Sequence, residues 1–76
     1  MWQTGKNITA LWASNDNENA WFWVPGLGWR KLSSATPYVF LQQLAVVCAA
    51  YDGNKTVNFF EVGIANNIEI QQIYSF

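Results

Sequence analysis

The feature that most constrains this chain is its longest uncharged stretch, residues 32–51, which lies between Lys31 and Asp52. Its second half is expected to form a helix that is apolar on nearly all sides. One side carries Phe40, Leu41, Leu44, Val47, Cys48 and Tyr51, most of the rest carries Tyr38, Ala45, Val46, Ala49 and Ala50, and only Gln42 and Gln43 interrupt the pattern. A surface helix normally has one apolar stripe and one polar face. The sequence therefore predicts that one side covers the monomer's core and the other is covered by a partner, most simply a second copy.

The size of the chain supports self-assembly. Its 76 residues are expected to form a single domain spanning residues 1–76. Domains this small are usually stabilised by disulfides, by a metal or by oligomerisation. Cys48 is the single cysteine, which excludes an internal disulfide, and the absence of histidine leaves no zinc cluster. No metal or cofactor is expected, and oligomerisation remains.

Charge and hydropathy exclude further classes. Only 12% of the residues are charged, the net charge is −1 and the sequence pI is about 4.9. A groove that follows nucleic-acid phosphates needs many more basic residues, so nucleic acid is not expected as a partner. The longest apolar-rich stretch, residues 38–51, is shorter than the ~20 residues of a membrane-spanning helix. With no leader visible, the expected location is either the cytoplasm or, after removal of a leader, outside the cell.

The pattern of residues predicts three strands, one helix and two strands. The helix should begin at Pro37 with Thr36 as its cap, and it should end at Asp52-Gly53 with Gly53 in the left-handed conformation. A bulge is expected near Gln71, where the inward-facing positions of the last strand shift. The expected strands are residues 7–13, 20–24, 29–32, 56–62 and 67–76, with a loop at 14–19 and turns at 25–26 and 63–66.

This order is that of the OB-fold, a five-stranded Greek-key barrel. A helix that ends in CAAY, the following run GNKTVNFF and a last strand IEIQQIYSF together resemble the pentameric B subunits of bacterial AB-type toxins and their relatives. The resemblance covers roughly residues 6–76. It implies a ring of five subunits, with each helix lining the central pore and glycans bound on the outer surface. Two features depart from that family: the chain has Cys48 in place of a disulfide-forming pair, and no export leader is visible.

Catalysis is not expected. The chain has no histidine, and Cys48 lies in an apolar run, where a free cysteine is usually a small buried hydrophobe. The carboxylates are scattered, and only Asp16 and Glu18 lie close together, in a polar loop. Acid–base catalysis needs a cleft and a raised pKa, and nothing in this pattern points to either.

The tryptophans carry the strongest functional signal. Trp21 and Trp23 share one face of an expected strand, Trp12 and Trp29 lie on adjoining strands, and Asn15, Asp16 and Asn17 lie in the neighbouring loop. Flat aromatic faces suit sugar rings, and amides and carboxylates suit their hydroxyls. The competing interpretation is that the tryptophans are core or interface anchors. The predicted ligand-binding residues are Trp12, Asn15, Asp16, Trp21, Trp23 and Arg30, and the predicted oligomer interface comprises Tyr38, Gln42, Ala45, Val46 and Ala49.

Arg30 and Lys31 are neighbours on a short strand and should point to opposite faces. Besides contact with an acidic sugar, the alternatives are solvation and pairing with Glu61 or Glu69 across a subunit boundary. The sequence thus favours a self-assembling glycan-binding protein. The rival hypotheses are a scaffolding oligomer without a small ligand and, against the acidic pI, an OB-fold that stacks single-stranded nucleic acid.

Overall fold

The structure is a computed structural model that describes residues 1–15, 17–63 and 67–75. It contains one helix, α1 (Pro37–Asp52), and six strands. The strands are β1 (Trp2–Asn7), β2 (Ala10–Ala13), β3 (Ala20–Val24), β4 (Gly28–Lys31), β5 (Thr56–Val62) and β6 (Glu69–Tyr74). A mainly β fold with one helix is therefore confirmed, but the order is β-β-β-β-α-β-β, with six strands where five were predicted.

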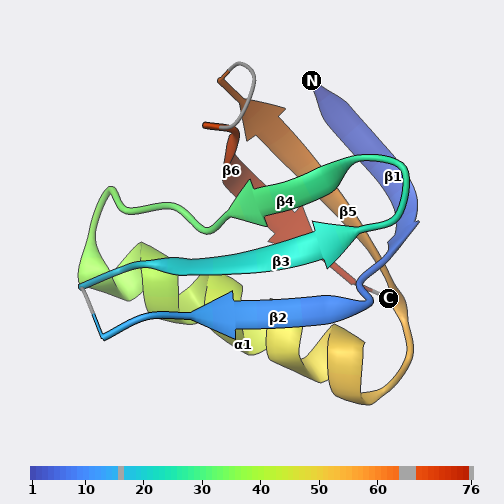
Figure 1. The fold of residues 1–76 in the computed structure, drawn as a ribbon, viewed down its shortest axis with the longest axis horizontal. Helices are drawn as coiled ribbons and strands as arrows, with labels where there is room; N and C mark the ends of the chain where they lie inside the picture. Colours follow the sequence, from blue (N-terminus) through green and yellow to red (C-terminus); the bar gives the residue numbers. More distant parts are fainter. Residues whose placement is uncertain (16, 64–66, 76) are drawn as a thin grey trace.

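The strands form one open mixed sheet in the order β1-β5-β6-β4-β3-β2. Neighbouring strands are antiparallel except β4 and β6, which run parallel and pair at Lys31 and Glu69. In Figure 1, β2, β3 and β4 lie together in front, while β5 and β6 cross behind them at a steep angle. The sheet is therefore strongly bent. Its two end strands, β1 and β2, are separated in the chain only by Ile8 and Thr9.

The core lies between the two parts of the bent sheet and the helix. Phe22 of β3 and Phe59 of β5 meet at its centre, with ring centroids 5.3 Å apart and an edge-to-face geometry. The buried apolar residues are Ile8, Ala20, Phe22, Val24, Leu32, Val47, Ala50, Val57, Phe59 and Ile70. Alternation along β3 places Phe22 and Val24 inside, and Trp21 and Trp23 on the opposite face, as predicted.

The helix begins where the sequence predicts. Pro37 is its first residue, and the hydroxyl of Thr36 accepts a hydrogen bond from the Val39 N–H at 3.1 Å. Its end differs from the prediction, because Gly53 has a φ of −84° and it is Asn54, at 52°, that adopts the left-handed conformation. The N–H of Gly53 bonds the carbonyl of Ala49 at 2.9 Å, which continues the helical turn by one residue.

The helix is also rotated relative to the predicted inner face. The side that contacts the core comprises Phe40, Gln43, Leu44, Val47 and Ala50, whereas Leu41, Cys48 and Tyr51, which were predicted to cover the core, are exposed. The rotation places the amide of Gln43 between two backbone groups. Its Oε1 accepts from the Ser33 N–H at 2.7 Å, and its Nε2 donates to the Gln71 carbonyl at 3.0 Å.

Among the remaining strand predictions, the one for the N-terminal segment differs most from the structure. The predicted strand 7–13 is confirmed over Ala10–Ala13, which forms β2, but it is interrupted at Ile8 and Thr9, where the chain leaves the sheet. Asn7 belongs to β1, whose other residues, 2–6, were not expected to be extended. A register shift between Gln3 and Lys6, with Gly5 at a φ of 61°, accommodates the polar, glycine-containing sequence of β1. Strand 56–62 is confirmed.

The bulge predicted near Gln71 is also confirmed, since Phe60 pairs with Gln72 and Glu61 with Ile70, so the register skips that residue. The last strand is shorter than predicted, ending at Tyr74. Phe76 and most of the predicted 63–66 turn lie outside the described residues.

Candidate ligand-binding groove

Cross-strand pairing places four tryptophans on one face of the sheet. Trp12 of β2 is paired with Trp21 of β3, and Trp23 of β3 is paired with Trp29 of β4. Directly paired residues point to the same side of an antiparallel sheet, as do positions two apart on one strand. The four indoles are therefore neighbours on the outer face of β2, β3 and β4. Trp21 is half-buried, whereas Trp12, Trp23 and Trp29 are 49%, 37% and 41% exposed.

These tryptophans line an open groove with a volume of about 760 Å³. The described residues of its wall are Trp12, Asn19, Trp21, Trp23, Leu27, Gly28, Trp29 and Arg30. The volume falls within the range of small-molecule sites in proteins, and the wall is mainly aromatic with a few polar groups. Such a surface can stack against flat rings.

The β3–β4 turn shapes one end of the groove. The Leu27 N–H donates to the Val24 carbonyl at 3.0 Å, and Gly26 has a φ of 86°, as expected when glycine follows proline in a type II turn. Beyond the turn, the rings of Trp23 and Trp29 meet edge to face, with centroids 5.4 Å apart and planes at 71°. They form a corner in the groove wall.

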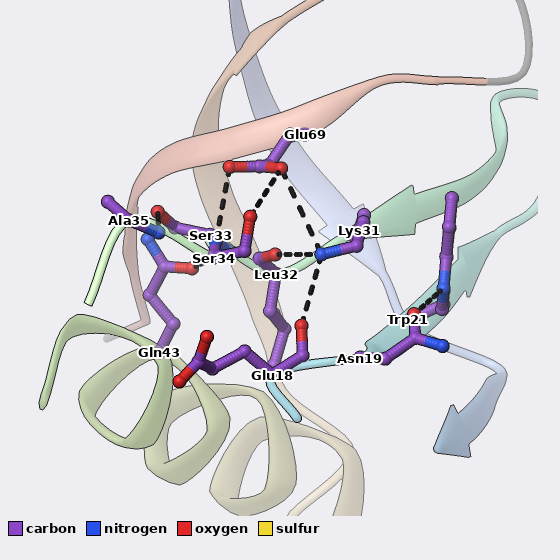
Figure 2. A network of polar contacts seen from close by, with 10 residues as sticks. All are labelled: Glu18, Asn19, Trp21, Lys31, Leu32, Ser33, Ser34, Ala35, Gln43 and Glu69. Carbon is purple, nitrogen blue, oxygen red and sulfur yellow. Dashed lines mark hydrogen bonds and ion pairs between the residues drawn. The ribbon is translucent and has the colours of Figure 1, made fainter. Parts of the chain in front are cut away.

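Asn19 fixes the other end. Its Oδ1 accepts a hydrogen bond from the Trp21 indole N–H at 2.9 Å, and its Nδ2 donates to the Ser14 hydroxyl at 2.9 Å. The loop that holds Asn19 is attached to β4 by Lys31, whose Nζ donates to the Glu18 carbonyl at 3.1 Å. Figure 2 shows Lys31 between this carbonyl and the Glu69 carboxylate, which lies 3.9 Å from Nζ.

Arg30 was predicted to contact a ligand, but its guanidinium is used inside the protein. Its Nε forms an ion pair with Glu61 of β5, and its Nη1 donates to the carbonyls of Leu27 at 3.0 Å and Trp29 at 3.1 Å. Arg30 is only 6% exposed. Burial raises the pKa of Glu61, but hydrogen bonds from Gln3 and Arg30 and the Arg30 charge outweigh it and hold that pKa below its usual value. The pair therefore stays ionised at neutral pH.

The two ion pairs show which carboxylates lie beside Arg30 and Lys31. One alternative was that Arg30 or Lys31 pairs with Glu61 or Glu69 across a subunit boundary. The structure pairs Arg30 with Glu61 and Lys31 with Glu69 within one chain.

Four of the six predicted ligand-binding residues line the groove: Trp12, Trp21, Trp23 and Arg30. The guanidinium of Arg30, however, is used within the protein. Asn15 is exposed in the loop and is not among the described residues of the wall, and Asp16 lies outside the described residues. The prediction omitted Asn19, although its spacing from Trp21 and Trp23 places all three on one side of an extended chain. No comparable sequence pattern indicated that Leu27 and Gly28 would line the groove.

The residues of the predicted oligomer interface lie together on the outer face of α1, separate from the tryptophan groove. Tyr38, Gln42, Ala45 and Ala49 are exposed on α1, and Val46 is half-buried. Leu41 and Cys48 are exposed as well. The outer face of α1 therefore presents apolar and uncharged side chains from residue 38 to residue 49.

No protein-family model and no curated protein sequence matches the chain significantly. Among the described residues, no helix is long and apolar enough to cross a membrane, and no group of three or more Cys, Asp or Glu side chains is arranged to hold a metal ion.

Proposed function

We propose that this chain is a non-catalytic binding protein that takes an uncharged glycan in the tryptophan groove. The observation that carries the proposal is the gathering of four tryptophans from three strands in one open groove of about 760 Å³. A tryptophan that served only as core would be covered, but Trp12, Trp23 and Trp29 each keep more than a third of their surface exposed. Aromatic area of this kind is costly to leave in water unless a ligand or partner covers it.

The state of the charges favours a neutral sugar. The guanidinium of Arg30 is neutralised by Glu61, and the ammonium of Lys31 lies beside Glu69. Neither is available to a carboxylate or a phosphate, so acidic sugars and nucleic-acid backbones find no counter-charge in the described wall. Trp12, Trp23 and Trp29 line the groove, and an indole N–H can donate to the hydroxyl or acetamido oxygens of a sugar.

The strand order supports an OB-like interpretation of the site. If β1 and β2 act as one strand bent at Ile8 and Thr9, the six strands become five and the sheet order closes on itself. In that reading β3 and β4 are the second and third strands of the barrel, the face on which OB-folds bind oligosaccharides and oligonucleotides. The groove lies on this face.

Self-assembly is part of the same proposal. The outer face of α1 is apolar and uncharged, with Tyr38 79% and Leu41 59% exposed. Identical faces without charge can meet without electrostatic repulsion, as an assembly of copies requires. We propose that copies of the chain associate through this face, in the toxin-B-like ring that the resemblance implies.

The groove is tested by titrating the folded protein with three trisaccharides: chitotriose and cellotriose, which are neutral, and sialyllactose, which is acidic. Tryptophan fluorescence and calorimetry report binding. We expect a neutral trisaccharide to bind, and Trp23→Ala to weaken it at least about 30-fold, the effect of losing a hot-spot side chain worth about 2 kcal/mol. Trp2→Ala is the matched control, because Trp2 packs against Phe60 and Tyr74 on a different part of the sheet.

Other results would point elsewhere. Preference for sialyllactose contradicts the neutral-sugar proposal. Saturable binding of a short single-stranded oligonucleotide that weakens with salt would make the groove a nucleic-acid site. If the intact oligomer shows no detectable binding of any of these ligands, the scaffolding alternative is favoured.

A further inference from the structure

Arg30 connects the interior of the protein to the backbone of the groove wall. Its side chain starts on β4 and points inward, since Phe22, its cross-strand partner, is fully buried. From there the guanidinium turns back to the Leu27 and Trp29 carbonyls, which flank Gly28. These three residues form the end of the groove wall, and Trp29 carries one half of the indole corner.

The far side of the guanidinium is anchored on another strand. Glu61 lies on β5, and β6 separates β5 from β4 in the sheet, so the ion pair passes across the inner face. Glu61 is itself held, because its Oε1 accepts a hydrogen bond from Gln3 Nε2 of β1 at 2.8 Å. The groove wall is therefore attached, through one side chain, to the opposite part of the sheet.

We propose that Arg30 is a positioning residue of the groove, which sets the angle between the Trp23 and Trp29 rings by holding the Leu27 and Trp29 carbonyls against Glu61. The expected effect on ligand binding rests on the proposed function of the groove. The effect of Arg30 on the angle between the two rings does not. Arginine suits this role, since its planar fork donates in several directions at once, whereas lysine presents a single compact ammonium. Lysine could keep the ion pair, but not all three contacts in the same arrangement.

The test uses Arg30→Lys and reads the indole ¹H–¹⁵N signals of the five tryptophans in the ligand-free protein. We expect the signals of Trp23 and Trp29 to shift or broaden while that of Trp12 keeps its position. Lys31→Met is the matched control on the same strand. It removes the bond to the Glu18 carbonyl, so it should move the signal of Trp21, whose cross-strand partner is Lys31, and leave the Trp23–Trp29 pair unchanged.

Ligand binding gives the second readout. Where wild-type protein binds chitotriose, Arg30→Lys should weaken it about tenfold while circular dichroism shows the native fold, the effect expected when one or two hydrogen bonds that order the site are lost. If no trisaccharide binds, the proposed function fails, and the indole signals still decide the role of Arg30.

Unchanged Trp23 and Trp29 signals in folded Arg30→Lys overturn the inference. If that variant does not fold, Glu61→Gln takes its place, since it keeps Arg30 and removes the charge that anchors it. If neither folds, the wild-type protein decides. In a pH titration of the wild-type protein, the ¹³C shift of the Glu61 carboxyl reports its protonation. We expect the indole signal of Trp29 to change over the same pH range. A Trp29 signal that does not change over that range overturns the inference.

Discussion

Gln43 shows how a single polar side chain can determine the orientation of a helix. It is only 5% exposed, and both ends of its amide are used, by the Ser33 N–H on one side and the Gln71 carbonyl on the other. The second bond satisfies β6 at its bulge, where a regular ladder is interrupted. Hydropathy ranks this residue as one that should face water, so the sequence could not have placed it inside.

At the scale of residues, we predict that Gln43→Leu lowers the free energy of unfolding by about 2–3 kcal/mol. The substitution leaves a buried N–H and a strand carbonyl without their partner, and each such group costs about 1–3 kcal/mol. Chemical denaturation measures the loss. Gln72→Leu is the control: Gln72 is exposed on β6, away from the outer face of α1, and its substitution should change stability by less than about 0.5 kcal/mol. Equal effects of the two substitutions would contradict this account.

The tryptophan face could be predicted, because alternation along 20–24 separates Phe22 and Val24 from Trp21 and Trp23 without knowledge of the fold. The role of Arg30 could not, since a basic residue on a short strand gives no sign that its partners are the Leu27 and Trp29 carbonyls. Such contacts depend on how the sheet bends.

At the scale of elements, local signals succeeded where the chain carries unambiguous stop and start residues. Thr36 and Pro37 mark the start of α1, and the strand after the helix has the predicted bounds. Prediction failed at β1, because Gly5 and its polar neighbours have a low propensity for strands. The strand forms through its pairing with β5. Its existence depends on tertiary contacts rather than on propensity.

The outer face of α1 gives a prediction about the helix as a unit. Ala45→Glu places a charge in the middle of this uncharged surface, so we expect the assembled protein to dissociate while its helical circular dichroism remains. Light scattering after size exclusion measures the mass. Gln72→Glu adds the same charge at an exposed position of β6 and should leave the assembly intact. A wild-type monomer at all concentrations would refute assembly through this face.

At the scale of the whole molecule, Glu61 joins three strands that are distant in the chain. It pairs with Arg30 of β4, accepts from Gln3 of β1, and lies near the end of β5. Its pKa is lower in the folded protein than its usual value of 4.5. Its ionised form therefore stabilises the fold above about pH 4.5, and this contribution is lost as the pH falls through the lower, folded-state pKa.

We accordingly predict that Glu61→Gln lowers the free energy of unfolding by about 1.5–3 kcal/mol at pH 7, the range for hydrogen bonds to charged groups. The difference between wild type and variant should shrink as the pH falls below 4.5. Denaturation at a series of pH values measures it. A difference that stays constant down to pH 2 would mean that the carboxylate's charge is not what matters.

The separation of the two faces of β3 has a consequence for how this protein can change over generations. Phe22 and Val24 support the fold from one side, while Trp21 and Trp23 belong to the groove on the other. Under the proposed function, substitutions on the outer side change the groove while Phe22 and Val24 stay in place in the core. If the groove binds a ligand as proposed, a lineage of such chains can change that ligand by exchanging a few aromatic side chains, while the buried ones keep the scaffold constant.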